Sequence, residues 1–185
     1  MERKADKREP GATVVRVKTK TKHHRTGVYA GSFDPLTIGH LWMIEQGARL
    51  FNRLFVAVGV NPDKNYSFPL EERLSMLRES TGSFRTVSVT TFSNRYLIHY
   101  AESVGATHIL RGIRSESDYE FERTMRHIND DLNSKICTVF LMPPRHIAEV
   151  SSSMVKGLIG PAGWKTVVRK YVPTPVYRRL VKSHP

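Results

Sequence analysis

The sequence predicts an α/β fold: a doubly wound, five-stranded parallel sheet with helices on both faces. Three observations point to it. Short apolar or β-branched segments alternate with amphipathic segments from residue 26 onward. The run RLFVAVGV at 53–60 is almost continuously apolar, as expected of a parallel strand covered on both sides. The connections between these segments are short, which favours strand–helix–strand units in one sheet.

The five strands are predicted in chain order, each from its own pattern. A short apolar run precedes the glycine turn at Gly31, and the run at 53–60 follows it. The segment RTVSVTTF is rich in β-branched residues, and THILRG and ICTVFLM are short apolar runs bounded by polar residues. The predicted strands cover 28–30, 53–60, 85–92, 107–112 and 136–142.

The helices are predicted from apolar periodicity and from residues that start or end helices. Leu70, Leu74 and Leu77 recur at helical spacing after Pro69. Gly105 ends a short helix. The predicted helices cover 41–51, 70–80, 96–105, 117–133, 154–160 and a last segment after Pro175.

Length and composition predict one domain with a basic extension. The chain has 185 residues, and we place the domain at 27–185, with a C-terminal helical segment. Residues 1–26 are polar and charged, so we expect disorder to about residue 12, with TVVRVKTKT a possible edge strand. Cys137 is the single cysteine, and its place in an apolar strand predicts a buried side chain. No apolar run reaches the length of a membrane span and none resembles a secretory signal, so we expect a cytoplasmic protein.

The net charge of +12 is concentrated at the two ends of the chain. Residues 1–26 carry nine Lys/Arg and three Asp/Glu, and residues 164–185 carry six Lys/Arg and no acid. Such ends attract nucleic acid or anionic surfaces. Neither end shows the aromatic interleaving of single-strand binders, so we favour solvated basic segments and do not expect a nucleic-acid partner.

The segment GVYAGSFDPLTIGH at 27–40 is the most informative in the chain. It predicts a strand, a tight turn with Ser32, and a helix that begins near His40. Helix N-termini present free N–H groups and a partial positive charge, so they bind phosphate groups. An imidazole there can donate a hydrogen bond to a phosphoryl oxygen. The Gly31–Ser32 turn and the LRGIR segment with Arg111 each come at the end of a predicted strand, so we expect them to converge in one cleft at the edge of the sheet where such folds bind ligands. The segment therefore predicts nucleotide chemistry.

This segment resembles the signature of the nucleotidylyltransferase superfamily, and further motifs resemble its bacterial phosphopantetheine adenylyltransferase family. They are NPDKNYSF around Lys64, ILRGIR with Arg111 and Arg114, DYEFE at 118–122, and VSSSMVK at 150–156. Their order is that of the family, and they span about residues 27 to 160. The resemblance implies a Rossmann-like nucleotidylyltransferase fold and transfer of adenylyl from ATP to 4′-phosphopantetheine in coenzyme A biosynthesis. It also implies a homohexamer and Mg²⁺ held mainly by the ATP phosphates, without protein ligands.

The resemblance further assigns a role to each matching position. The catalytic residues it implies are His40, Lys64, Arg111 and Ser32. Those that contact ATP are Ser32, Phe33, His40, Gly112, Ile113, Arg114, Glu122, Ile147, Ser151, Ser152 and Ser153. Those that contact phosphopantetheine are Ser32, Lys64, Leu97, Arg111 and Asn129.

The reaction implied by the resemblance needs no general base, because the attacking phosphate is already an anion. It requires that two polyanions be brought together and that negative charge be stabilised on the α-phosphate and on the leaving pyrophosphate. Cations and N–H donors can do both. Lysine can follow a moving phosphate, and arginine presents a planar fork of permanent donors.

Several of these residues also have a plain structural interpretation. Lys64 taken alone is a solvated loop lysine, and Ser151 to Ser153 form a helix N-cap cluster whether or not they bind phosphate. We interpret Asp34 as ordering its turn, with a metal ligand as the alternative. Asp118 and Glu120 are expected on a solvated helix face with Arg123 and Arg126.

The chain departs from the family pattern at a few positions. Arg95 and Tyr96 replace small apolar residues beside the pantetheine arm, Ile147 replaces an aromatic near adenine, and Gly157 replaces an acid after the serine motif. These changes bear on acceptor identity and on regulation by coenzyme A rather than on adenylyl transfer. Two alternatives stay open: a transferase for another phosphorylated acceptor such as nicotinamide mononucleotide, and a catalytically idle nucleotide- or RNA-binding protein that uses the basic termini.

Overall fold

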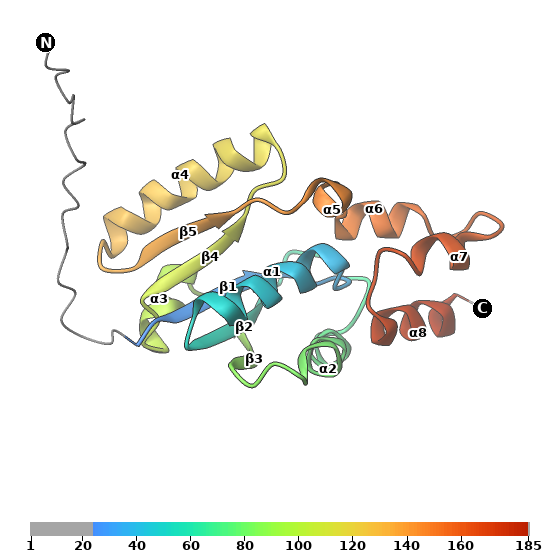
Figure 1. Ribbon diagram of the computed structural model, residues 1–185, viewed down its shortest axis with the longest axis horizontal. Coiled ribbons are helices and arrows are strands. Elements are labelled where there is room, and N and C mark those ends of the chain that lie inside the picture. Colours follow the sequence, from blue (N-terminus) through green and yellow to red (C-terminus); the bar gives the residue numbers. More distant parts are fainter. Residues whose placement is uncertain (1–23, 185) are drawn as a thin grey trace, which may run out of the picture.

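The computed structural model describes residues 24–184, and the predicted disorder and edge strand within residues 1–23 lie outside them. A five-stranded, all-parallel sheet forms the centre (Figure 1). The strand order is β3-β2-β1-β4-β5. The strands are β1 Thr26–Gly31, β2 Arg53–Val60, β3 Val87–Ser93, β4 His108–Gly112 and β5 Cys137–Leu141. The predicted sheet is confirmed, with boundaries that differ by one or two residues at most strand ends.

The helices connect the strands and cover both faces of the sheet. Their bounds are α1 Ile38–Leu50, α2 Leu70–Thr81, α3 Leu97–Ser103, α4 Glu116–Leu132, α5 Arg145–Ala148, α6 Ser152–Gly157, α7 Trp164–Val168 and α8 Thr174–Ser183. The sequence prediction missed α5 and α7, which have only four and five residues. So short a segment shows no helical periodicity of its own.

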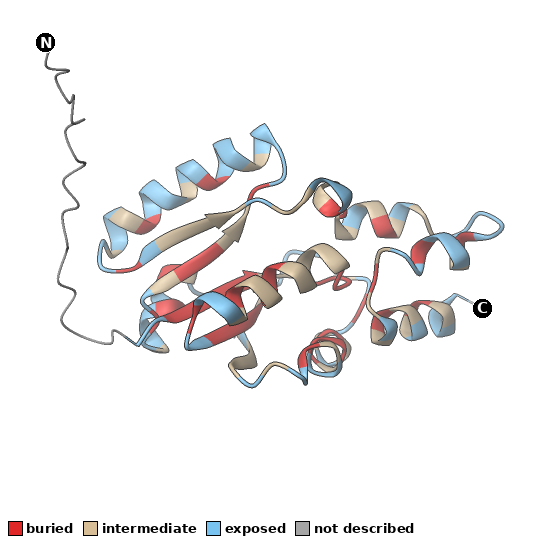
Figure 2. Cartoon of the chain, viewed as in Figure 1, coloured by how far each residue is buried: buried red, intermediate tan, exposed pale blue. Residues whose placement is uncertain are grey.

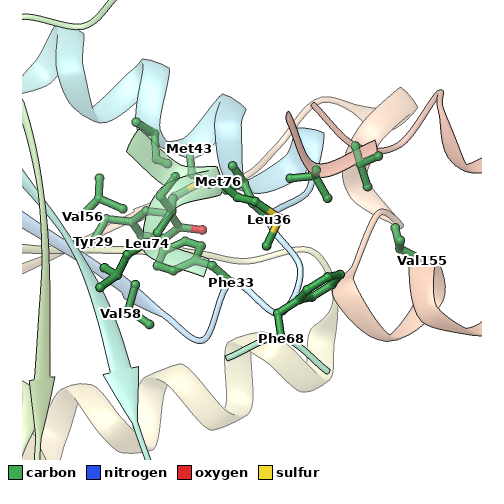
Figure 3. Close-up of a cluster of buried hydrophobic side chains, with 14 of the residues drawn as sticks. Tyr29, Phe33, Leu36, Met43, Val56, Val58, Phe68, Leu74, Met76 and Val155 are labelled. Atoms are coloured by element: carbon green, nitrogen blue, oxygen red, sulfur yellow. The ribbon is translucent and has the colours of Figure 1, made fainter. Parts of the chain in front are cut away.

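The buried apolar residues form two clusters, one on each face of the sheet. Along β1, Tyr29 belongs to the first cluster, whereas Val28 and Ala30 belong to the second. This alternation is the two-residue period of a strand. The first cluster is covered by α1, α2 and the C-terminal helices, and part of it is shown in Figure 3. The second is covered by α3. Figure 2 shows the buried residues concentrated on the central strands.

The sheet runs outward from β1 in two directions, and this organises the site. The chain passes from β1 to β2 and β3 on one side, then crosses back to place β4 and β5 on the other. Gly31 pairs with Val58 of β2, and Tyr29 pairs with Leu110 of β4. The gap between the loops after β1 and β4 is a topological switch point, where folds of this kind bind ligands.

Cys137 is exposed, so the prediction of a buried core cysteine is wrong. It is the first residue of β5, which lies at the edge of the sheet. An edge strand is covered less completely than a central one, and its apolar sequence does not reveal this position. In the part of the chain described, no helix combines the length and apolarity needed to cross a membrane.

Candidate functional site

His40 lies in the first turn of α1, where the predicted helix start is confirmed. Thr37 is the N-cap residue and its hydroxyl accepts a hydrogen bond from the His40 N–H. In return, the Thr37 N–H donates to Nδ1 of His40 across 3.1 Å. This is a capping box in which histidine takes the place of the usual glutamate or glutamine. Because Nδ1 accepts, the proton of the neutral imidazole lies on Nε2.

The surroundings of His40 keep its imidazole neutral. Burial, and to a lesser extent the positive charge of Arg114, lower the pKa of His40 to about 4. The ring of Phe33 meets the imidazole edge-on, with 5.2 Å between ring centres. At neutral pH the residue is therefore a fixed, uncharged N–H donor.

Gly39 explains how α1 comes close to the segment that precedes α6. A Cβ at this position would lie 3.2 Å from the carbonyl oxygen of Val150, which is closer than nine in ten real Cβ contacts. The absence of a side chain thus lets the start of α1 lie against the backbone of Ile147 and Val150.

A cavity of about 370 Å³ opens beside His40, and we call it the histidine cavity. Its walls come from β1, the start of α1, the loop after β4, α4, and the segment 143–152. The predicted ATP-contacting residues that line it are His40, Gly112, Arg114, Glu122, Ile147, Ser151 and Ser152. Residues from four separate sequence motifs therefore share one cavity.

A second cavity of about 380 Å³, the lysine cavity, lies on the other side of the β1 loop. It is lined by Ser32 and by residues that follow β2 and β3, including Lys64, Arg95 and Leu97. Lys64 is exposed in its loop, and its Nζ lies 5.9 Å from the centre of the Tyr66 ring.

The two cavities meet at Ala30, Gly31 and Arg111, which line both. Their other walls divide along the strand order. The lysine cavity takes its walls from the β2–β3 side of β1, and the histidine cavity takes them from the β4–β5 side. The predicted convergence of the Ser32 turn with Arg111 is confirmed.

Arg111 is held by a carboxylate from α4. Its Nε donates to both carboxylate oxygens of Glu122, at 2.9 and 2.8 Å, and its Nη2 also donates to this group. Nη1 donates to the carbonyl oxygen of Ala30 across 3.1 Å. Glu122, predicted to contact the nucleotide, here orients the arginine, although it also lines the histidine cavity.

Arg114 is paired with Asp118, and this corrects the placement of Asp118 on a solvated helix face. Nε of Arg114 donates to Asp118 across 2.8 Å. This hydrogen bond raises the pKa of Arg114 and lowers that of Asp118. Asp118 also lines the histidine cavity. Arg126 pairs instead with Asp130, four residues along the helix, at 2.9 Å.

The three serines before α6 do not behave alike. The Ser151 hydroxyl caps the helix by accepting from the Met154 N–H, and the Ser152 hydroxyl donates to the carbonyl oxygen of Pro35 across 2.8 Å. Both also line the histidine cavity. Ser153 is exposed and lines none of the cavities described here.

Two further predicted ATP contacts have buried side chains outside the histidine cavity. Phe33 is 1% exposed and packs in the core, as Figure 3 shows, and Ile113 is 8% exposed. Their backbone groups remain in the loops after β1 and β4. Asn129 lies in a separate, smaller cavity of about 160 Å³, which Leu97 and Arg111 also line. Leu97 and Arg111 therefore line both the lysine cavity and this smaller cavity.

Asp34 orders a loop distant in sequence rather than its own turn. Its carboxylate, 2% exposed, accepts from the N–H groups of Ser67 and Phe68, each at 2.9 Å. The ammonium of Lys156 lies 3.3 Å from it. This carboxylate thus ties the β1 loop to the segment before α2 and to α6.

Three residues near the site were not found from the sequence. Tyr29 and Phe121 line the histidine cavity, and burial raises the pKa of Tyr29 so that its hydroxyl stays protonated. Arg73 is buried beneath the Ser32 turn. Tyr29 lies in an apolar strand and Arg73 in an ordinary amphipathic helix, so neither carries a local signal of its role.

The site offers few free ligands for a metal ion. Residues 24–184 contain no cluster of three or more His, Cys, Asp or Glu side chains suited to hold one. The carboxylates of the histidine cavity, Asp118 and Glu122, are engaged by Arg114 and Arg111.

The chain is similar in sequence to a known family and to several known proteins. A family described as cytidylyltransferase-like matches residues 28–158. Phosphopantetheine adenylyltransferase of Chromobacterium violaceum is 58% identical over 160 residues, which cover 86% of this chain and 98% of that protein. The enzyme of the same name from Neisseria meningitidis serogroup B is 57% identical over 86% of this chain and 94% of its own length.

Among solved structures, Plasmodium falciparum nicotinic acid mononucleotide adenylyltransferase complexed with APC has a TM-score of 0.64 at 14% identity. The match covers 87% of this chain and 96% of that one. A second structure of that enzyme, complexed with NaAD, gives a TM-score of 0.60 at 16% identity, with 87% and 96% covered. At such identities the likeness concerns the nucleotidylyltransferase fold alone.

Proposed function

We propose, because the chain belongs to the phosphopantetheine adenylyltransferase family, that it transfers the adenylyl group of ATP to 4′-phosphopantetheine. The products are dephospho-coenzyme A and pyrophosphate, the reaction is reversible, and it belongs to coenzyme A biosynthesis. The observation that carries this proposal beyond the family name is the meeting of two cavities at Ala30, Gly31 and Arg111. Such a pair of cavities suits two substrates that react at their common boundary.

In this proposal, ATP occupies the histidine cavity and the phosphorylated acceptor occupies the lysine cavity. Lys64, Ser32 and Arg111 bind the acceptor phosphate, whose oxygen attacks the α-phosphorus. A new phosphorus–oxygen bond forms as the α–β anhydride bond breaks, and pyrophosphate leaves with its electron pair. Arg114 and the N–H and hydroxyl groups at 151–152 lie on the side suited to bind the leaving group.

His40 acts here as a neutral donor. Its imidazole is uncharged, and Nε2–H donates a hydrogen bond to the α-phosphoryl oxygens as negative charge builds on them. Because Thr37 already orients the ring, no reorganisation is needed during the reaction.

Mg²⁺ is part of the proposal as an ion held by the ATP phosphates and water. The engagement of Asp118 and Glu122 by arginines fits this arrangement, since Mg²⁺ in nucleotide sites usually keeps few protein ligands. When bound, it neutralises phosphate charge. A cytoplasmic location and the absence of a nucleic-acid partner remain parts of the proposal as well.

We also propose that the chain forms a homo-oligomer, with a hexamer as the expected state. Helix α4 exposes several large apolar side chains, and Met142 after β5 is 73% exposed. Those on α4 are Tyr119, Phe121, Ile128 and Leu132. Figure 2 shows how little of this helix is buried within one chain. Apolar surface of this kind is typical of interfaces, and light scattering after size-exclusion chromatography measures the mass directly.

The proposed reaction is tested by pyrophosphate release from ATP and Mg²⁺ with phosphopantetheine, with nicotinamide mononucleotide, or with no acceptor. We expect release with phosphopantetheine alone. Release only with the mononucleotide would retain the chemistry and change the acceptor. No release with either would favour the idle nucleotide- or RNA-binding alternative, and a steep salt dependence of RNA affinity would then support it.

A further inference from the structure

Arg73 of α2 is a buried cation without a carboxylate partner. Its side chain is 2% exposed, and among residues 24–184 no Asp or Glu lies within ion-pair distance of it. Burying an unpaired charge is costly. The contacts that Arg73 makes instead therefore need an explanation, and two of the residues that it contacts, Ser32 and Tyr66, line the lysine cavity.

The guanidinium of Arg73 joins three segments. Nη1 donates to the carbonyl oxygen of Ser32 across 2.8 Å, and Nε donates to that of Phe68 across 3.1 Å. The guanidinium carbon lies 3.9 Å from the centre of the Tyr66 ring, which lines the lysine cavity. Tyr66 in turn accepts a hydrogen bond from the Asn61 N–H across 2.9 Å. Arg73 therefore supports both the β1 turn and the loop that carries the acceptor-side residues.

The bond from Arg73 to Ser32 also sets the direction of the next N–H group. A trans peptide is planar, and its C=O and N–H point to opposite sides. With the Ser32 carbonyl turned toward Arg73, the N–H of Phe33 points away from it. Within the described segment, this N–H has no hydrogen-bond acceptor.

The same peptide is held in a strained conformation. Phe33 has φ of 47°, in the left-handed region that residues other than glycine rarely adopt. Rotation of the Ser32–Phe33 peptide would relieve this strain, but it would break the bond to Arg73. Strained backbone of this kind persists where its surroundings hold it.

We propose that Arg73 is a positioning residue: it holds the Ser32–Phe33 peptide so that the Phe33 N–H donates to a substrate phosphate at the boundary of the two cavities. This inference rests on the proposed function, which places phosphates at that boundary. Arg73 itself touches no substrate. Its charge is compensated by the two carbonyl oxygens and the Tyr66 ring, which together select one orientation of the turn.

The test is Arg73→Lys, which keeps the charge but loses the planar fork that spans both carbonyls. We expect kcat to fall at least about 10-fold, since a single transition-state donor contributes about 10²–10³ in rate. The KM values for ATP and phosphopantetheine should change less than kcat. Arg78→Lys on the same helix is the matched control, because Arg78 is exposed, and it should leave all three constants unchanged.

A spectroscopic measurement separates positioning from a purely structural role. In ¹⁵N-labelled protein observed by TROSY NMR, α,β-methylene-ATP should shift the Phe33 amide proton downfield in wild type, and less or not at all in Arg73→Lys. The proposal would be overturned if Arg73→Lys had a lower melting temperature than wild type but showed the same ligand-induced shift of the Phe33 amide proton and the same kcat per folded protein. The wild-type titration suffices if the variant fails to fold, because a Phe33 amide that does not respond also overturns it.

The two proposals fail in different ways. Absence of pyrophosphate release from wild type with phosphopantetheine refutes the proposed function. If the enzyme releases pyrophosphate but α,β-methylene-ATP leaves the chemical shift of the Phe33 amide proton unchanged, only the role of Arg73 is refuted.

Discussion

The neutral state of His40 leads to a prediction that separates its hydrogen-bond donor from its structural role. The Thr37 N–H occupies Nδ1, so only Nε2–H is available to a substrate. His40→Asn places an amide oxygen near the position of Nδ1, which preserves the helix cap, and leaves no atom at the position of Nε2. We expect kcat to fall by about 10²–10³, which is about 3–4 kcal/mol of transition-state stabilisation.

The assay is pyrophosphate release under saturating ATP and phosphopantetheine, combined with calorimetric titration of α,β-methylene-ATP. Binding of this analogue to His40→Asn should remain close to that of wild type, because the donor acts mainly in the transition state. His40→Gln is the complementary variant, since its amide N–H₂ can reach toward the Nε2 position and glutamine is a usual capping-box residue at this position. It should retain more turnover than His40→Asn. Turnover of His40→Asn within threefold of wild type would remove His40 from the mechanism.

The same reasoning fixes the sign of the pH dependence. The pKa of His40 is about 4 in the folded protein and about 6.5 when unfolded. The unfolded chain therefore binds the proton more readily between these values. Stability from the neutral imidazole is fully present above pH 6.5 and is lost as the pH falls toward 4.

This shift corresponds to about 3 kcal/mol as an order of magnitude. Chemical denaturation measures the free energy of unfolding of wild type and His40→Asn between pH 7 and 4.5. We expect this free energy to fall more in wild type than in His40→Asn. The wild-type kcat should carry no inflection from His40 between pH 5 and 8. An inflection near pH 6.5 that is absent in His40→Gln would show that the imidazole titrates there, and the neutral-donor argument would be wrong.

Three further predictions concern the remaining parts of the site. Arg111→Ala should weaken phosphopantetheine about 10-fold or more and α,β-methylene-ATP less, measured by calorimetry; an effect confined to the nucleotide would reverse the assignment of the two cavities. Asp34→Asn should lower the free energy of unfolding by about 2–4 kcal/mol, because the ammonium of Lys156 and two N–H groups lose a buried charged acceptor; unchanged denaturation midpoints would contradict this. Deletion of residues 1–23 should leave kcat and both KM values unchanged, since both cavities are lined by residues after position 28; a large loss of activity would show that the basic extension contributes to the site.

Much of the fold followed from the sequence because parallel strands carry a strong local signal. The run at 53–60 was bounded correctly at both ends, and the TIGH segment located the first turn of α1. The convergence of Ser32 with Arg111 followed from topology alone, because Ser32 comes directly after β1 and Arg111 lies near the end of β4, and both strands end at one edge of the sheet.

The ion-pair and hydrogen-bond partners of the charged residues could not be predicted from the sequence, because they depend on distances between helices and strands. Nothing in the local sequence distinguishes Asp118, which holds Arg114, from Glu120 on the exposed part of the same helix. The buried position of Arg73 likewise depends on how α2 packs beneath the β1 turn. A pattern of apolar residues identifies the buried face of a helix, but it does not identify an arginine that lies within it.

In the proposed function, the strand order separates the reacting groups from the residues that contact the acceptor. The reacting groups would lie at the centre of the sheet, where the β1 loop and Arg111 of β4 meet. The acceptor would be contacted by the loops after β2 and β3, which carry Lys64 and Arg95. Arg95, one of the departures from the family pattern, therefore lies two strands away from β1, at the edge of the sheet. Packing constrains side chains least at that edge. His40 and its cap are set by α1 and the β1 loop, so variation at the acceptor edge leaves the donor in place. Exchange of Arg95 should accordingly alter the KM for the acceptor in pyrophosphate release, and a matching loss of kcat with an unchanged acceptor KM would contradict this separation.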